Sequence, residues 1–150
     1  MPGAHEIGPV VVGIDGSEPS VHAVDHALDE ASWRGAALHV VHVLDVTPAV
    51  LHLADDRTIT TRELAESDRE EIWKRAAPSL DRAGVDVVKV NRDGDPGDEL
   101  CRYAREIGAS VVVVGPRGRG MLVEAMLGST AHTVIKDADG DVLVVKRRAT

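Results

Sequence analysis

The stretch GPRGRGMLVEAMLGST, residues 115–130, has residue types and a spacing that suit the binding of an anion. Its key positions, in the pattern G-x2-G-x9-G-S, are Gly115, Gly118, Gly128 and Ser129. A backbone without side chains approaches a ligand closely, and a serine at a helix start points its hydroxyl and the first amides at the same space. We therefore expect a turn and a helix start that both face an anion.

Other phosphate-binding loops fit this stretch less well. A P-loop has the pattern G-x4-G-K-[ST], but Gly115 and Gly120 are followed by Met121 instead of lysine. A dinucleotide fingerprint, G-x-G-x-x-G, does not follow the first predicted strand. The alternative without a ligand is a flexible strand-to-helix loop in which Arg117 and Arg119 are simply solvated. With a ligand, the two arginines add positive charge.

Five short, valine-rich runs predict the strands that must position this stretch: residues 9–14, 37–44, 85–90, 110–115 and 141–146. Helical patterns lie between them, at residues 17–34, 61–83, 96–107 and 129–137. The strict alternation of strand and helix predicts an α/β fold. We expect an open, doubly wound, five-stranded parallel sheet with helices on both faces, Rossmann-like in architecture.

Capping residues and apolar spacing predict the limits and the inward faces of these helices. Ser17 and Gly35 bound the first helix, and Asp95 and Gly108 bound the third. The predicted inward residues are Val21, Val24, Leu28 and Ala31 in the first helix, Leu100, Ala104 and Ile107 in the third, and Val134 and Ile135 in the fourth. Pro78 predicts a kink or a break in the second helix.

Ligands of an open doubly wound sheet bind beyond the carboxyl ends of the strands, where the strand order reverses. Asp15, in the segment GIDGSEPS, lies just past the end of the first predicted strand and is a candidate ligand-binding residue. The alternative is that it only caps the helix that follows. Residues 45–59 form the one long irregular connection, which we expect near the site.

Composition excludes several classes of partner. The chain has 150 residues, which suit one domain over residues 1–150, and a net charge of −8, which argues against nucleic acid and anionic membranes. Cys101 is the single cysteine, so no intramolecular disulfide forms and a reducing compartment is compatible. No signal peptide and no apolar run of about 20 residues is present, and we expect a cytoplasmic protein.

Four other features have a structural explanation that we prefer to a functional one. His22 and His26 have the spacing of a metal-binding pair but are expected to be solvated. His42 alternates with valines and is expected in the interior with a hydrogen-bond partner. Cys101, near a helix start that could lower its pKa, has no catalytic partner and is expected to be inert. The run ESDREEIWKR is expected to be a solvated helix face.

The chain resembles the universal stress protein family over nearly its whole length. The segments VVVGIDGSEPS, LHVVHVLDV, GDPGDEL, ASVVVVGPRGRG and MLGSTAHTVI occur in the order typical of the family. The pattern G-x2-G-x9-G-[ST] resembles the signature of the branch that binds ATP. The resemblance implies the strand order 3-2-1-4-5, with the site between strands 1 and 4, and a homodimer formed through the last strand, from Val142 to Val145.

The resemblance also implies a set of nucleotide-binding residues. They are Gly13, Ile14, Asp15, Val43, Gly115, Gly118, Arg119, Gly128, Ser129 and Thr130. Asp15 and the backbone before it would contact adenosine, and Val43 would pack against adenine. The glycine turn and the helix start would hold the ribose and the phosphates. Pro116 and Ala131 depart from the family pattern, because each removes a hydrogen-bonding group from the phosphate side.

The function implied is that of a regulatory protein of the stress response that binds ATP together with Mg²⁺. Preference for AMP or cyclic AMP is an alternative that the sequence does not separate from ATP. A weak ATP hydrolase or phosphotransferase is another, although we can name no catalytic residue because no positioned base is evident. The third alternative is a dimeric interaction module with a vestigial site.

Overall fold

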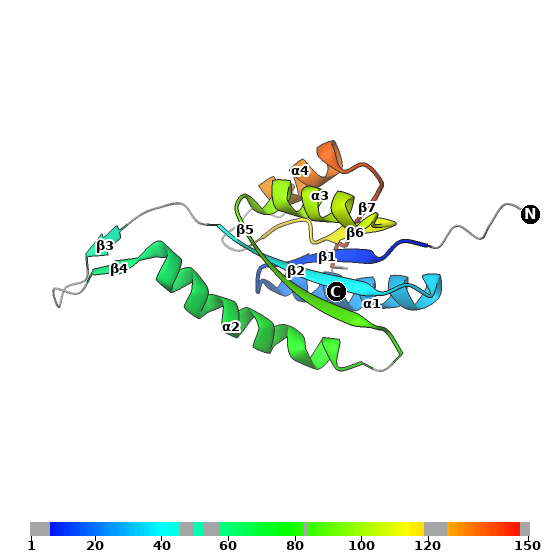
Figure 1. The fold of residues 1–150 in the computed structure, drawn as a ribbon, viewed down its shortest axis with the longest axis horizontal. Coiled ribbons are helices and arrows are strands. Elements are labelled where there is room, and N and C mark those ends of the chain that lie inside the picture. The colour runs from blue at the N-terminus through cyan, green and yellow to red at the C-terminus, as the bar shows by residue number, and fades with distance from the viewer. Residues whose placement is uncertain (1–6, 46–49, 53–57, 83, 119–125, 148–150) are drawn as a thin grey trace, which may run out of the picture.

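The structure is a computed structural model that describes residues 7–45, 50–52, 58–82, 84–118 and 126–147. In chain order its elements are β1 (Val10–Ile14), α1 (Glu18–Arg34), β2 (Leu38–Leu44), β3 (Val50–His52), β4 (Thr58–Thr60), α2 (Thr61–Leu80), β5 (Val87–Asp93), α3 (Pro96–Ile107), β6 (Val111–Val114), α4 (Ser129–Asp137) and β7 (Asp141–Val144). Figure 1 shows a central sheet between two layers of helices.

The sheet has five strands in the order β5-β2-β1-β6-β7, and all four pairings are parallel. Counted among the sheet strands alone, this order is 3-2-1-4-5, which confirms the predicted fold. The chain first builds outward from β1 to β2 and β5, and then continues on the other side of β1 with β6 and β7. The strand order therefore reverses between β1 and β6, where a ligand site is expected.

Two apolar layers hold the helices on the sheet. On one face, α1 and α2 pack on alternate strand residues such as Val10, Val12 and Val40; on the other, α3 and α4 pack on Val11 and their neighbours. The alternation follows from the period of two in a strand. Both layers are fully excluded from water at these valines, and each buried side chain of this kind contributes roughly 1.5–3 kcal/mol.

The predicted caps of α1 and α3 are confirmed. The Ser17 hydroxyl accepts a hydrogen bond from the amide of Ser20, and Gly35 ends α1 in the left-handed conformation at φ 62°. Asp95 accepts from the amide of Asp98, and α3 ends at Gly108. The fourth helix also has its predicted bounds.

Pro78 does not interrupt α2, contrary to expectation. The helix continues through Pro78 and ends two residues later at Leu80, short of the predicted residue 83. A proline removes its own amide hydrogen bond and crowds the preceding turn. Because Pro78 lies in the last turn, its effect coincides with the end of the helix instead of dividing it.

Three of the predicted inward residues are more exposed than expected. The buried residues of α1 are Ser20, Ala23, Val24, Ala27, Leu28 and Ala31. Val21 and Ile107 are only partly buried, and Ile135 is 49% exposed. In α4 the narrow inward face is filled by Ala131 and Val134, which turns the next residue, Ile135, away from the sheet.

The connection over residues 45–59 was predicted to be irregular, but it contains the short strand β3 and most of the short strand β4. β3 and β4 pair with each other antiparallel and form a separate two-stranded sheet. Figure 1 shows this pair at the far end of α2, away from the five-stranded sheet. The prediction that the whole connection lies near the site is therefore wrong for β3 and β4, although Asp45 at its start does line the pocket described below.

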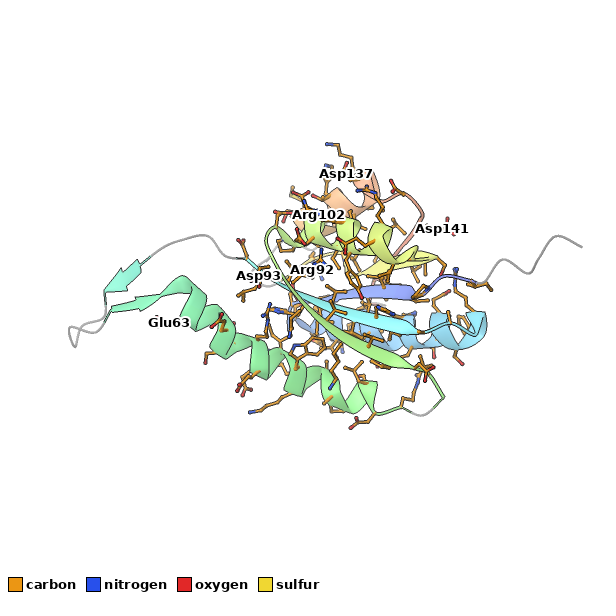
Figure 2. The ribbon with its side chains drawn as sticks, in the orientation of Figure 1. Glu63, Arg92, Asp93, Arg102, Asp137 and Asp141 are labelled. Carbon is orange, nitrogen blue, oxygen red and sulfur yellow. The ribbon has the colours of Figure 1, made fainter. Side chains whose placement is uncertain are left out.

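β5 is longer at its carboxyl end than its valine run predicts, because polar side chains extend it. Arg92, near the end of β5 (Figure 2), directs its guanidinium to α3, where it donates to Glu99 at 3.2 Å and to Glu106 at 3.1 Å. Arg102 also contacts Glu99, a carboxylate that is only 7% exposed. The hydrogen bonds to Arg92 hold the pKa of Glu106 below its usual value. These charges attach α3 to the edge strand.

Candidate ligand-binding site

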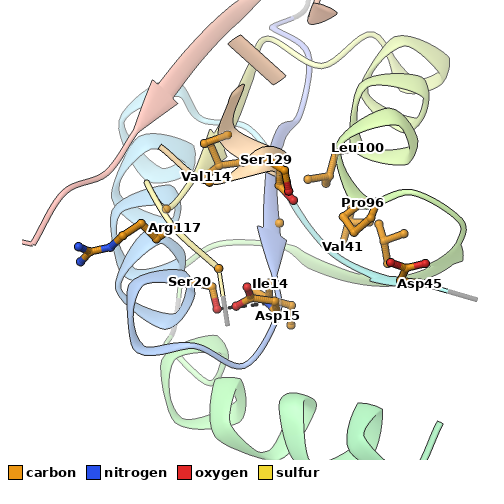
Figure 3. A pocket seen from close by; sticks show the side chains of 17 residues that line it. Ile14, Asp15, Ser20, Val41, Asp45, Pro96, Leu100, Val114, Arg117 and Ser129 are labelled. Atoms are coloured by element: carbon orange, nitrogen blue, oxygen red, sulfur yellow. Dashed lines mark hydrogen bonds between the residues drawn. The ribbon is translucent and has the colours of Figure 1, made fainter. Parts of the chain in front are cut away.

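A cavity of about 370 Å³ opens at the carboxyl ends of β1, β2 and β6. It lies at the point where the strand order reverses, as expected for this architecture. Its lining residues are Gly13, Ile14, Asp15, Ser20, Val41, Val43, Asp45, Pro96, Leu100, Val114, Gly115, Arg117, Gly118, Gly128, Ser129, Thr130 and Ala131. They come from five separate segments of the chain, and Figure 3 shows their side chains converging.

The structure brings nine of the ten predicted site residues to this cavity: Gly13, Ile14, Asp15, Val43, Gly115, Gly118, Gly128, Ser129 and Thr130. Arg119 lies outside the described residues. Val41 was missed although it shares a face of β2 with Val43, two residues on. Pro96 and Leu100 were missed because they reach the pocket from α3, which no local pattern places there.

Asp15 is held in place by the residues that follow it. Its Oδ1 accepts hydrogen bonds from the Ser17 amide at 2.9 Å and the Ser17 hydroxyl at 2.5 Å. The Asp15 amide donates to the Ser20 hydroxyl at 3.3 Å. The helix cap is Ser17 and not Asp15. The carboxylate is therefore fixed at the edge of the pocket, as a ligand-binding residue would need to be.

Gly118 lies against the second oxygen of that carboxylate. A β-carbon placed on Gly118 would stand 2.6 Å from Asp15 Oδ2. Real β-carbons do not approach an oxygen so closely, so a side chain at residue 118 would displace the carboxylate. A side chain at residue 118 would therefore change the position of the Asp15 carboxylate at the cavity.

The glycine turn, Gly115 to Gly118, and the start of α4 at Gly128 contact each other. The Gly128 amide donates to the carbonyl oxygen of Pro116 at 2.7 Å, which joins the turn after β6 to the start of α4. Pro116 lacks an amide hydrogen but supplies the acceptor of this bond. Unlike α1 and α3, α4 has no side-chain cap. The first amides of Ser129 and Thr130 therefore face a pocket without a competing cap, and such amides attract anions.

The opposite side of the cavity is apolar. Val41, Val43, Pro96 and Leu100 form it, and Asp45 stands at its end in Figure 3. Leu100 is 2% exposed and lies so close to Gly13 that a β-carbon there would be 2.7 Å from Leu100 Cδ1. The cavity thus combines an apolar half with a half that has amides and hydroxyls. This arrangement suits a ligand with a planar apolar part and an anionic part.

The histidines and the cysteine for which the sequence favoured a structural role lie outside the lining of the cavity. His42 is 5% exposed, and its Nδ1 accepts a hydrogen bond from Arg69 Nε at 3.1 Å, which confirms an interior histidine with a partner. Burial raises the pKa of the Cys101 thiol, which argues against a reactive thiolate; the expectation that Cys101 is inert stays a prediction. His22 and His26 contact edge to face with ring centroids 5.0 Å apart. Within the described ranges, no group of three or more potential metal ligands occurs.

The run ESDREEIWKR is not only a solvated face. Ile72 is 5% exposed and belongs to the core. Trp73 donates from Nε1 to Asn91 at 2.9 Å, and Arg69 and Arg75 donate to groups on the sheet side of α2. Sequence spacing does not reveal such partners, because they lie on strands distant in the chain.

The fold and the pocket together define an open, doubly wound α/β protein with a ligand-sized cavity at its switch point. The universal stress protein family model matches residues 6–146, and the chain belongs to that family. It is 32% identical to universal stress protein MJ0531 of Methanocaldococcus jannaschii over 138 residues, covering 92% of this chain and 81% of that protein. Universal stress protein YxiE of Bacillus subtilis is 31% identical over 144 residues, covering 91% and 97%.

Solved structures share this fold. Universal stress protein UspA from Lactobacillus plantarum has a TM-score of 0.76 at 19% identity, covering 93% of this chain and 98% of that chain. A universal stress protein in complex with cAMP has a TM-score of 0.65 at 27% identity, covering 94% and 98%. The Archaeoglobus fulgidus protein in complex with dAMP has a TM-score of 0.69 at 23% identity, covering 94% and 99%. No helix among the described residues is long and apolar enough to cross a membrane.

Proposed function

We propose that this protein binds ATP at the cavity between β1 and β6 and acts as a cytoplasmic regulator in the stress response. The observation that carries the proposal is the convergence of the uncapped α4 start, the glycine turn and Asp15 on one cavity with an apolar wall. Adenine would lie against Val43 and Leu100, and the phosphates would follow the glycine turn to Ser129.

ATP would enter together with Mg²⁺, and the residues present fit that ion. Asp15 is the carboxylate beside the glycine turn, and Ser17 already orients one of its oxygens. Its other oxygen faces Gly118, on the side where phosphates would lie. Hard oxygen ligands are what Mg²⁺ prefers, and it is usually held by phosphates plus one or two carboxylates. Bound Mg²⁺ would offset the repulsion between Asp15 and the phosphates.

AMP or cyclic AMP is the second candidate ligand, favoured by the two related complexes with monophosphates. Arg117 favours the longer ligand, because it lines the polar end and its guanidinium points outward from the cavity centre in Figure 3. A β- or γ-phosphate would extend in that direction. Calorimetric titration with ATP and Mg²⁺, AMP and cyclic AMP in parallel distinguishes them. No heat and no thermal shift with any of the three at millimolar concentration would refute nucleotide binding.

Hydrolysis of ATP is tested separately, by measuring phosphate release from ATP with the same protein. Sustained phosphate release that Ser129→Ala or Asp15→Ala abolishes would establish an enzyme. Binding without release supports a regulatory role. Mass spectrometry of small molecules released from freshly purified protein then identifies the nucleotide that the cell supplies. An empty pocket, with partner binding unaffected by Gly128→Trp, would instead favour an interaction module with a vestigial site.

We further propose that the protein forms a homodimer through the strand from Val142 to Val145. β7 is paired on one side, with β6, and lies at the edge of the sheet. Acidic residues precede this strand and basic residues follow it: Asp139 and Asp141, then Lys146 and Arg147. Antiparallel pairing about its middle places Asp141 opposite Lys146 of the partner subunit, an attractive cross-strand pair.

Sedimentation velocity tests this dimer. Asp141→Lys should weaken self-association, and the double variant Asp141→Lys, Lys146→Asp should restore it because the charges are only exchanged. Equal association of all three proteins would rule out the charge-matched antiparallel register.

A further inference from the structure

One face of α2 lies against the back of the ligand cavity. Arg69, Ile72 and Arg75 recur on it at a spacing of three residues and all contact the carboxyl end of the sheet. The cavity itself is lined by residues of β1, α1, β2, α3, β6, the glycine turn and the start of α4, and no described residue of α2 takes part. α2 therefore contacts the strand ends and the turn that carry the site, from the face of the sheet opposite the ligand cavity.

Arg75 holds the turn that carries Asp15. Its Nη1 donates a hydrogen bond to the Gly16 carbonyl oxygen at 3.1 Å. Gly16 has φ 82°, and a β-carbon there would meet Ile72 Cγ1 at 2.8 Å, so α2 is packed directly on this turn. The two residues on either side of Gly16 are Asp15, at the cavity, and Ser17, which orients the Asp15 carboxylate. A shift of α2 would thus be transmitted to Asp15.

Arg69 holds the neighbouring strands in the same way. Its Nε donates to His42 at 3.1 Å, and its Nη2 donates to the Arg92 carbonyl oxygen at 3.0 Å. His42 precedes Val43, a residue of the cavity wall. One helix thus fixes the ends of β1, β2 and β5 together.

α2 also continues directly into the part of the molecule farthest from the sheet. β4 ends at Thr60 and α2 begins at Thr61, and β3 pairs with β4. Figure 1 shows that β3, β4 and the first turns of α2 project beyond the five-stranded sheet. We refer to residues 50–52 and 58–68 as the arm. Because a helix is stiff, displacement of the arm moves Arg69 and Arg75 as well.

We propose that Arg75 is a positioning residue that couples the nucleotide site to the arm through the Gly16 carbonyl. This inference rests on the proposed nucleotide binding. An energetic coupling between two sites is reciprocal. Nucleotide binding therefore restrains α2, and a contact that moves the arm changes the affinity for nucleotide.

The test compares Arg75→Met with the adjacent Lys74→Met in the full-length protein. Lys74 is on the same helix but its side chain is 70% exposed and pairs with Glu71 at 3.3 Å, away from the site. Titration calorimetry with ATP and Mg²⁺ should show an affinity for Arg75→Met that is roughly two- to thirtyfold weaker than in the wild type. Lys74→Met should bind as the wild type does, and Arg75→Lys should recover part of the loss, since a lysine can still donate one hydrogen bond.

Hydrogen exchange supplies a readout that a merely structural role would not move. ATP should slow amide exchange over residues 61–80, which include the arm residues 61–68, in the wild type and in Lys74→Met, and should not do so in Arg75→Met. If Arg75→Met does not fold, judged by circular dichroism, Arg75→Gln takes its place in the same comparison. Equal affinity and equal protection in the wild type and the Arg75 variants would overturn the coupling. A wild type that does not bind ATP would overturn the proposed function and this inference with it.

Discussion

At the scale of single residues, Asp15 and Gly118 set the shape of the polar half of the site. They belong to different loops, one after β1 and one after β6. The two residues lie so close together that a β-carbon on Gly118 would be 2.6 Å from Asp15 Oδ2. The missing side chain therefore has two consequences. It would let a phosphate of the proposed nucleotide approach the backbone, and it leaves the carboxylate in the position that Ser17 gives it.

Gly118→Ala should weaken ATP binding by roughly ten- to a hundredfold, because the new methyl group displaces Asp15 and fills part of the phosphate path. Calorimetric titration measures the change. The matched control is Gly140→Ala, since a β-carbon at Gly140 would have its nearest neighbour at an ordinary contact distance of 3.7 Å. Similar losses of affinity in the two variants would contradict this account of Gly118.

The sequence predicted the cavity residues that belong to recognisable turns and helix starts. It missed the cavity residues that are brought there by the packing of a helix on the sheet. The glycine turn and Asp15 follow strand ends in the chain, Ser129 opens a helix, and all of them line one cavity. Leu100 covers Gly13 only because α3 crosses that part of the sheet. Its position depends on tertiary packing, which is not encoded in any local spacing.

At the scale of elements, α2 shows how polar residues can be misjudged. Its run ESDREEIWKR is mostly charged, and a solvated face was expected there. Arg69 instead has a side chain that is 18% exposed and donates to the buried His42. The hydrophobic spacing of Ile72, Ala76 and Leu80 places this face on the core, and the arginine on the same face is carried inward with it.

Arg69→Met should therefore destabilise the protein by about 1–3 kcal/mol, because a buried imidazole nitrogen loses its donor. Urea unfolding followed by circular dichroism measures the free energy of unfolding. Lys74→Met, which removes an exposed charge from the same helix, should change that free energy by less than about 0.5 kcal/mol. An Arg69 variant as stable as the Lys74 variant would contradict the role assigned to the Arg69–His42 hydrogen bond.

At the scale of the whole molecule, polar contacts fasten both helical layers to the edge of the sheet at β5. On one side Arg69 and Trp73 of α2 bind β5, and on the other Arg92 of β5 binds two glutamates of α3. His39, on the neighbouring strand, adds a contact on the α3 side, where its Nδ1 lies 2.6 Å from the Tyr103 hydroxyl. Burial lowers the pKa of His39 below the ordinary value of 6.5.

That shift predicts how the stability of the whole protein depends on pH. A group whose folded pKa lies below its unfolded value contributes stability above the unfolded value, and that contribution is lost as pH falls through the folded one. The free energy of unfolding should therefore decrease as pH falls below 6.5, before the carboxylates Glu106 and Asp139, whose pKa values are also lowered, begin to take up protons. Urea unfolding at a series of pH values measures this. His39→Gln, which cannot be protonated, should lack the first decrease and keep the later one, so an unchanged profile in that variant would assign the first decrease to another group.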